Sequence, residues 1–250
     1  MIPDGDRVLR TLKLNGDVEA KFTSLFVRSA GRPPAINPVL NLLALSIVRE
    51  ATPYVVVPAI LALLAAVFGL WIVFSFFLII ALFMAFFFRN PERTPPLDQN
   101  VVVAPADGKV TRIEPVNVGD LDSGTIVSIF LSPFDVHINR SPIAGTISAM
   151  AYKPGRFMMA TNEKASLENE QNILTLEGEQ ITVICKQIAG ILARRVVCWK
   201  KKGDNLTLGE RFGMIKFSSR TDLVLPGNVK VMVAEGDRVQ GGTTIIGKIE

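Results

Sequence analysis

The feature that most constrains this 250-residue chain is a run without a single charged residue, from Pro53 to Phe88. It reads PYVVVPAILALLAAVFGLWIVFSFFLIIALFMAFFF, whereas a helix needs only ~20 apolar residues to cross a bilayer. A secretory signal is a poor match, because the run is longer than the apolar part of a signal and no small-residue cleavage site follows it. The sequence therefore predicts that residues 51–89 lie in a membrane.

Two geometries are open for this membrane segment. It can form one long tilted helix, or a hairpin of two shorter helices folded back around Gly69. Basic residues flank the run on both sides, with Arg28, Arg32 and Arg49 before it and Arg89 and Arg93 after it. Basic flanks stay on the cytoplasmic side of a membrane, so this pattern favours a hairpin with both ends in the cytoplasm. We therefore expect a protein of the cell membrane whose remaining domain faces the cytoplasm.

After the membrane run the pattern changes to short strand-like segments separated by glycine. The polar, proline-rich stretch RNPERTPPLDQN leads into segments such as VVVAPADGKV, GTIVSIFLS and QITVICKQIAG. Strands of this length and spacing predict a mainly β fold, a β-rich sandwich or barrel-like domain over residues 90–250. The stretch EGDRVQGGT between two late strands has the form of a lipoyl/biotinyl-like half-hammerhead, with APADGKVTRI as its matching partner. Residues 1–50 are predicted to be an N-terminal extension that ends in a lead-in amphipathic helix.

The inventory of chemically reactive side chains is small. One histidine and two cysteines cannot supply the four Cys or His ligands of a structural zinc site, so no metal is expected. Cys185 and Cys198 lie in apolar runs and are predicted to be buried and reduced. The basic clusters ARR (193–195) and WKKK (199–202) are either solvated faces or sites of attraction for anionic membrane lipids. No nucleic-acid module accompanies them, so no nucleic-acid partner is expected.

A stretch near the C-terminus, RFGMIKFSSRTDLVLP (residues 211–226), raises a separate question. Two strand-like runs are separated by SSRTD, which lacks the glycine or asparagine usual in a tight hairpin. With this stretch in view, the chain resembles the phosphatidylserine decarboxylase proenzyme family, of the short type that includes archaetidylserine decarboxylase-like proteins. Besides the hydrophobic anchor, the matching pieces stand in order: FFFRNPERTPP, APADGKV, IFLSPFDVHINRSPIAG, YKPGRF, KASLENEQN, QIAGILARRVVCW, GERFGMIKFSSRTDLVLP and EGDRVQGGTTIIG.

This resemblance implies that the chain cuts itself between Ser218 and Ser219. The Ser219 hydroxyl attacks the carbonyl carbon of Ser218, so that the acyl group moves from nitrogen to oxygen as an ester. Loss of the Ser219 α-proton then expels the ester as a carboxylate, and the dehydroalanine left behind hydrolyses to a pyruvoyl group and ammonia. The ketone is the electron sink that decarboxylation requires. The implied reaction converts phosphatidylserine to phosphatidylethanolamine and CO2 in phospholipid biosynthesis.

The same resemblance assigns roles to five further residues. His137, in FDVHINR, is the candidate base, and the ordinary pKa of an imidazole, ~6.5, suits proton transfer near neutrality. Asp107, in APADGKV, is implied in the processing machinery, although Asp-Gly is also a common turn pair. Arg140, Lys164 and Asn169 are predicted to contact the substrate.

Two departures from the family pattern bear on the chemistry. Arg140 stands where longer relatives have a second histidine, so His137 serves both cleavage and decarboxylation, or another group such as Asp107 with water performs one of them. Ser218 stands where the family usually has glycine, and its Cβ restricts the strained backbone that the acyl shift requires. An attack by Ser218 on the Phe217 carbonyl is the less favoured alternative, because a bulky residue would then precede the cut.

Other classes of protein remain open at this point. A lipid-binding relative that does not mature is compatible with Ser218, and a membrane-anchored β-rich adaptor is compatible with EGDRVQGGTTIIG. The sequence favours the enzyme, with phosphatidylserine and anionic membrane lipids as partners and two chains of one precursor that stay associated. A homodimer is left open, as is the linkage of the lipid. The stretch GRFMMA is either a strand packed into the core or a membrane-facing edge through which lipid enters.

Overall fold

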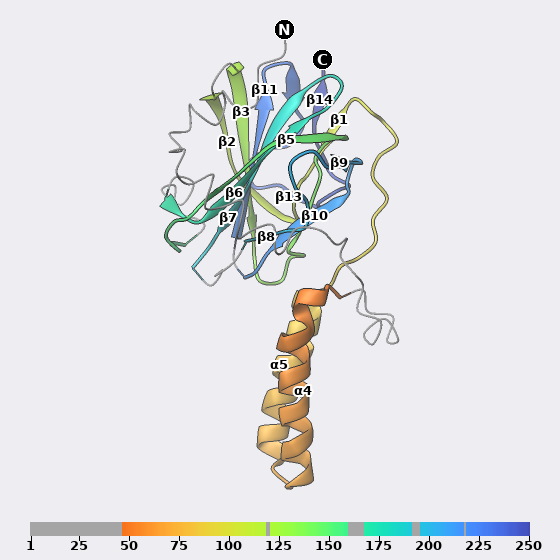
Figure 1. Cartoon of the computed structure of the whole chain (residues 1–250), viewed down its shortest axis with the longest axis vertical. Helices are drawn as coiled ribbons and strands as arrows, with labels where there is room; N and C mark the ends of the chain where they lie inside the picture. The colour runs from red at the N-terminus through yellow and green to blue at the C-terminus, as the bar shows by residue number, and fades with distance from the viewer. Residues whose placement is uncertain (1–46, 119–120, 160–167, 192–195, 218) are drawn as a thin grey trace. The chain divides into compact units, whose positions relative to one another are not determined.

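The computed structural model describes residues 47–118, 121–159, 168–191, 196–217 and 219–250 (Figure 1). Within these residues, 47–92 and 93–250 form two compact units. The first unit is helical and the second is built from strands. The helical unit contains η1 (Arg49–Ala51), α4 (Thr52–Val67) and α5 (Trp71–Phe87).

The helices α4 and α5 lie side by side and are joined by a tight turn (Figure 1). Gly69 makes this turn with a φ of +69°, in the left-handed region that glycine adopts without steric cost. The apolar run is therefore broken into a helical hairpin rather than one long helix. The stretch Arg49–Val67 is long and apolar enough to cross a membrane, and α5 is an apolar helix of somewhat shorter length.

The second unit is mainly β, as the sequence predicts, and all its strand pairs are antiparallel. Its eight-stranded sheet has the order β13 (Arg238–Val239), β2 (Gly108–Val118), β3 (Leu121–Leu131), β11 (Ser219–Pro226), β7 (Thr182–Ala189), β6 (Gln171–Glu177), β5 (Gly145–Lys153) and β9 (Asn205–Leu206). One small sheet has the order β1 (Val101–Val103), β14 (Ile245–Ile249) and β12 (Val229–Val231). The other has the order β4 (Ile138–Arg140), β10 (Arg211–Ile215) and β8 (Val196–Cys198).

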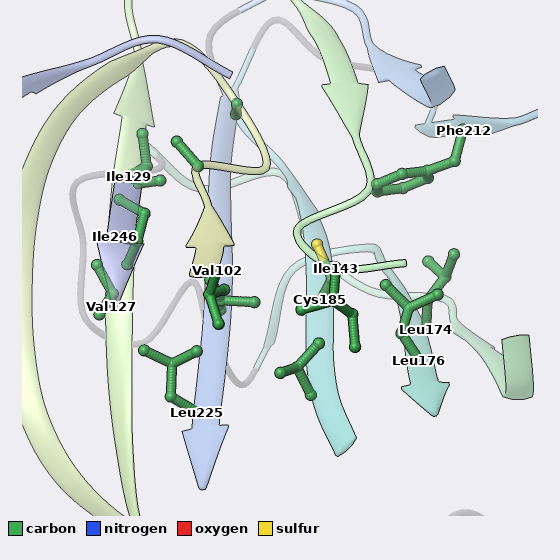
Figure 2. Close-up of a cluster of buried hydrophobic side chains, with 14 of the residues drawn as sticks. Val102, Val127, Ile129, Ile143, Leu174, Leu176, Cys185, Phe212, Leu225 and Ile246 are labelled. Atoms are coloured by element: carbon green, nitrogen blue, oxygen red, sulfur yellow. The ribbon is translucent and has the colours of Figure 1, made fainter. Parts of the chain in front are cut away.

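The main core fills the space between the large sheet and elements of the two small sheets (Figure 2). Val102 and Ile246 from β1 and β14 pack with Val127, Ile129 and Leu225 of the large sheet. Residues further along the sheet, including Leu174, Leu176 and Cys185, extend the same cluster toward Phe212 of β10. The small sheets thus cover one face of the large sheet, and the buried apolar area holds them there.

Strand β11 is buried along its whole length at the centre of the large sheet. Because side chains alternate along a strand, Thr221, Leu223 and Leu225 face the main core, whereas Arg220 and Asp222 face the other way and pair with each other at 2.9 Å. The segment SSRTD is therefore not a loop, since its last four residues begin β11. Residues 216–218 separate β10 from β11 in the chain.

Both cysteines are free and buried, which confirms the sequence prediction. Burial raises the pKa of the Cys198 thiol to about 11. Burial, together with the nearby Asp222 carboxylate, raises the pKa of Cys185 further still. Since thiolate is the reactive form of cysteine, these upward pKa shifts disfavour reaction of both side chains at neutral pH.

Candidate functional site

Ser219 is the first residue of β11 and lies at one end of the large sheet. It pairs with Leu131, the last residue of β3, on one side and with Ala189, the last residue of β7, on the other. The residue is fully buried, and its Oγ has no hydrogen-bond partner among the described residues. Such an orphan hydroxyl is uncommon in a folded protein and marks a candidate reactive group. We refer below to this end of the large sheet, where β3 and β7 end and β11 begins, as the Ser219 end.

Two residues before this serine the backbone is strained. Phe217 has a φ of +57°, and it is the only residue other than glycine with a positive φ in the described part of the chain. A bulky residue in the left-handed region is a conformational outlier that stores strain. The family resemblance places the requirement for strain at Ser218, which lies outside the described residues. The structure places strained backbone one residue earlier.

His137 reaches the Ser219 end through strand register rather than through sequence proximity. The Ile215 N–H donates to the His137 carbonyl at 3.2 Å, so His137 lies beside the end of β10. Strand β10 ends four residues before Ser219 in the chain, and β4 pairs antiparallel with it. Strand β4 therefore begins near the Ser219 end, where β11 also begins.

A hydrogen bond fixes β4 and β11 relative to each other. Asn139 Nδ2 donates to Thr221 Oγ1 at 3.0 Å. His137 lies two residues before Asn139, and Ser219 lies two residues before Thr221. Side chains two apart on a strand point the same way and are separated by roughly 7 Å along it. This register places His137 at the level of Ser219, with both residues buried.

Asn139 belongs to a chain of buried side-chain amides that the sequence analysis did not identify. Its Oδ1 accepts from Gln187 Nε2 at 2.8 Å, and Gln187 Oε1 accepts from Asn172 Nδ2 at 2.9 Å. Gly213, opposite Asn139 in the ladder, leaves room for this chain, because a Cβ there would lie 2.9 Å from Gln187 Nε2 and 2.3 Å from the Val197 carbonyl oxygen. The amides link the small sheet that carries His137 to the large sheet that carries Ser219.

Asp107 also lies at the Ser219 end, but its carboxylate is already occupied. It precedes Gly108, the first residue of β2, which is two strands away from β11. Both oxygens bind the Arg93 guanidinium, at 2.5 and 2.7 Å, and Oδ1 also accepts from the Gly241 N–H at 2.8 Å. Arg93 Nη1 further donates to the Gly241 carbonyl at 2.6 Å. In the described structure Asp107 therefore joins the start of the domain to a C-terminal loop, a task that the sequence analysis did not assign to it.

The structure describes two of the three residues that are predicted to contact the substrate, Asn169 and Arg140. Asn169 is buried at the Ser219 end, where Nδ2 donates to the Ala189 carbonyl at 2.7 Å and to the Met158 carbonyl at 2.9 Å, and Oδ1 accepts from the Met158 N–H at 3.0 Å. Its amide thus clamps the β5–β6 loop to the end of β7. The buried Arg140 donates a side-chain hydrogen bond to the Gly209 carbonyl at 3.1 Å, and its backbone N–H donates to the Pro105 carbonyl at 2.9 Å. Lys164 lies outside the described residues.

The basic cluster after β8 lies away from the Ser219 end. Val196 pairs with Ile215 and Cys198 with Gly213, so β8 runs away from that end and the lysines follow its last residue. Lys200 forms an ion pair with Glu210 at 2.5 Å. Partial burial acts to raise the pKa of Glu210, but the bonds from Lys200 and Thr207 outweigh it and the net shift is downward. Within the described residues of this cluster, Lys200 is thus paired with a nearby acidic side chain of the same domain.

Comparison with known proteins agrees with this geometry. A family model described as phosphatidylserine decarboxylase matches residues 80–247. A phosphatidylserine decarboxylase proenzyme of Geotalea uraniireducens (strain Rf4) is 42% identical over 203 residues, which cover 80% of this chain and 95% of the relative. One of Solibacter usitatus (strain Ellin6076) is 48% identical over 171 residues, which cover 68% and 81%. One of Chlorobium phaeobacteroides (strain DSM 266 / SMG 266 / 2430) is 46% identical over 170 residues, which cover 68% and 80%. The family resemblance is confirmed, and the chain belongs to the phosphatidylserine decarboxylase family of carboxy-lyases.

Proposed function

We propose that the chain decarboxylates phosphatidylserine with a pyruvoyl group that it makes from Ser219 by cutting the bond between Ser218 and Ser219. The observation that carries this proposal is the setting of Ser219 at the head of the central strand, two residues after a strained Phe217 and level with His137. Its hydroxyl is buried and has no hydrogen-bond partner among the residues that the structure describes. An unpaired hydroxyl is not held back by another hydrogen bond, so it suits attack on the preceding carbonyl.

The residues around Ser219 fit the group that would form there. Once made, a pyruvoyl group supplies an electron sink for the loss of CO2. Ser219 Oγ attacks the Ser218 carbonyl carbon, and His137 accepts the hydroxyl proton as the Oγ–C bond forms. The same proton then passes to the Ser219 nitrogen as the C–N bond breaks, which leaves an ester and a free amine. Thr221 and Asn139 hold the two strands in register. Leu131 and Ala189, on the neighbouring strands, exclude water from the site.

The large and small chains would stay associated after the cut. The small chain would contribute β11 to the centre of the large sheet, where it pairs with β3 and β7 of the large chain. It would also contribute β13, which pairs with β2, and β14, which pairs with β1. Three strands of the small chain thus share ladders with the large chain, and the ladders do not depend on the cut bond.

The hairpin of α4 and α5 is proposed to anchor the enzyme in the cell membrane, with the β domain on the cytoplasmic side. Its helices are about 25 Å long, close to the ~30 Å of a bilayer's hydrocarbon core. We also propose that the segments paired through Val239 and Gly108 form a lipoyl/biotinyl-like half-hammerhead that serves as scaffold.

The function is tested by measuring CO2 release from phosphatidylserine in detergent micelles. We expect release with the wild-type chain and none above background with Ser219→Ala, because the variant cannot form a ketone. Ser128→Ala is the matched control: Ser128 is a buried serine on neighbouring β3, and its Oγ also has no hydrogen-bond partner among the described residues. Activity in Ser219→Ala equal to that of Ser128→Ala would overturn the proposal.

Loss of the Asn139 amide is expected to slow self-cleavage of the chain. Asn139→Ala removes the link to Thr221 and leaves Gln187 without its acceptor, so we expect cleavage to slow about tenfold, in line with the loss of a buried hydrogen bond worth ~1.4 kcal/mol. Cleavage is followed by gel electrophoresis during cell-free synthesis. Gln171→Ala, which truncates another buried amide on the opposite face of the large sheet, serves as the control.

A further inference from the structure

We propose that an apolar rim at the Ser219 end docks on the surface of a phospholipid bilayer. The rim consists of Phe134, Phe157, Met159 and Ile191. The exposed fractions of these residues are 69, 38, 61 and 55%. This inference rests on the proposed function, because it concerns how the site reaches a substrate that resides in a membrane.

The four rim residues come from three loops that meet at one end of the sheet. Phe134 follows Leu131, which pairs with Ser219, by three residues, and Ile191 follows Ala189, which also pairs with Ser219, by two. Phe157 and Met159 flank Met158, whose backbone is held by the Asn169 side chain to the end of β7. Segments far apart in the sequence thus expose apolar side chains around one buried serine.

The opposite end of the sheet has a different character. Its described turns include the one between β6 and β7, with Gly178, Glu179 and Gln180, and the one between β11 and β12, with Gly227 and Asn228. None of the exposed large apolar side chains of the described residues belongs to these two turns. The exposed Leu97 lies three residues before Asn100, which accepts a hydrogen bond from Gln180, and it is a single side chain rather than a group. Since large apolar side chains gathered at one site mark an interaction surface, the asymmetry points to a partner at the Ser219 end.

A bilayer is the partner that fits this end. Phosphatidylserine carries two acyl chains and stays in the membrane, whereas Ser219 is fully buried, so a reacting headgroup must come to the domain at this end. Exposed Arg156 and Arg238, with 78% and 72% of their side chains accessible, flank the rim and are paired with Glu168 and Asp135. Aromatic and aliphatic side chains bordered by arginine are typical of a surface that enters the headgroup region.

The test uses the full chain reconstituted in vesicles of phosphatidylcholine and phosphatidylglycerol. Met159→Cys and Ile191→Cys are each labelled with a bimane dye, and Asn228→Cys at the opposite end is the control. The native cysteines are buried, so the dye reports on the introduced position. We expect lipids with a spin label on the acyl chain to quench the dye at 159 and 191 and to leave the dye at 228 unchanged. Equal quenching at all three positions, or none at any, overturns the proposal.

A second readout measures activity with two forms of the substrate. In the double variant Met159→Ser/Ile191→Ser we expect the KM for phosphatidylserine in vesicles to rise about tenfold, since two apolar side chains no longer bury surface in the bilayer. The kcat and KM for a short-chain, monomeric phosphatidylserine are expected to stay within about twofold of the wild type, because binding of this substrate buries no side chain in a bilayer. An equal loss with both substrates counts against docking. The quenching experiment needs no turnover, so a chain without decarboxylase activity would refute the proposed function and leave the docking surface still testable.

Discussion

Replacing His137 with alanine is expected to leave most of the chain uncut. General base catalysis by a positioned side chain contributes roughly 10²–10⁴-fold to a rate, and His137 is the only imidazole in the sequence. We therefore expect cleavage of His137→Ala to slow by at least ~100-fold. The measurement is the fraction of cut chain against time during cell-free synthesis. Ser128→Ala is again the control for a buried polar side chain that lies outside the proposed site.

The same variant separates the two roles that one imidazole can have. If His137 acts in cleavage, the purified variant consists of uncut precursor with the unfolding temperature of uncut Ser219→Ala. A His137→Ala chain that is cut at the wild-type rate but releases no CO2 would contradict the role in cleavage. The companion His137→Gln retains hydrogen-bonding capacity without a titratable ring. It is expected to be as slow as the alanine variant, because it cannot accept the hydroxyl proton.

Removing one partner of the Arg93–Asp107 pair is expected to cause a large loss of stability. The two side chains are 6% and 14% exposed, and breaking a buried ion pair leaves an uncompensated charge at a cost of about 3–5 kcal/mol. For a chain of this size we expect Arg93→Ala and Asp107→Ala each to lower the unfolding temperature by about 10 °C. The measurement is thermal unfolding of the uncut Ser219→Ala chain in detergent, so that maturation does not change the species compared.

The double variant of Arg93 and Asp107 decides between two roles for Asp107. It either stabilises the fold by pairing with Arg93 or takes part in self-cleavage. If the pair is the role of Asp107, Arg93→Ala/Asp107→Ala loses much less stability than the sum of the single changes, because neither charge is left alone. Cleavage should also slow to a similar extent in the two single variants. Slow cleavage in Asp107→Ala together with wild-type cleavage in Arg93→Ala would instead support the role in processing that the family resemblance implies.

The sequence predicts much of the fold, because its signals are local. Alternating apolar residues and glycine punctuation mark the strands of the second unit, and the uncharged run marks the helical hairpin. The roles of Ser219 and His137 are also predicted from the sequence, through short stretches that resemble a family, and they stay predictions. By contrast, the segment SSRTD reads as an interruption, although most of it continues into the central strand. Arg220 and Asp222 pair with each other on the face of β11 opposite Leu223. A hydropathy pattern does not predict that two charged side chains lie within a buried strand.

The interactions that organise the site could not be predicted, because they join residues far apart in the chain. Arg93 meets Gly241, and Asn139 meets both Gln187 and Thr221. No local pattern specifies such a pairing, since it depends on which strands become neighbours in the sheet. The same reason applies to Asn169, which the sequence assigns to substrate and the structure engages in holding a loop. Pairings of this kind become visible only once the register of the strands is known.

Self-cleavage at Ser219 is tested by the intact mass of the purified chain beside that of Ser219→Ala. We expect two fragments for the wild type, with the cut between residues 218 and 219, and a small fragment that is lighter than the corresponding serine peptide by one ammonia. Ser219→Ala should give a single uncut mass. A single uncut mass in the wild type would contradict the account.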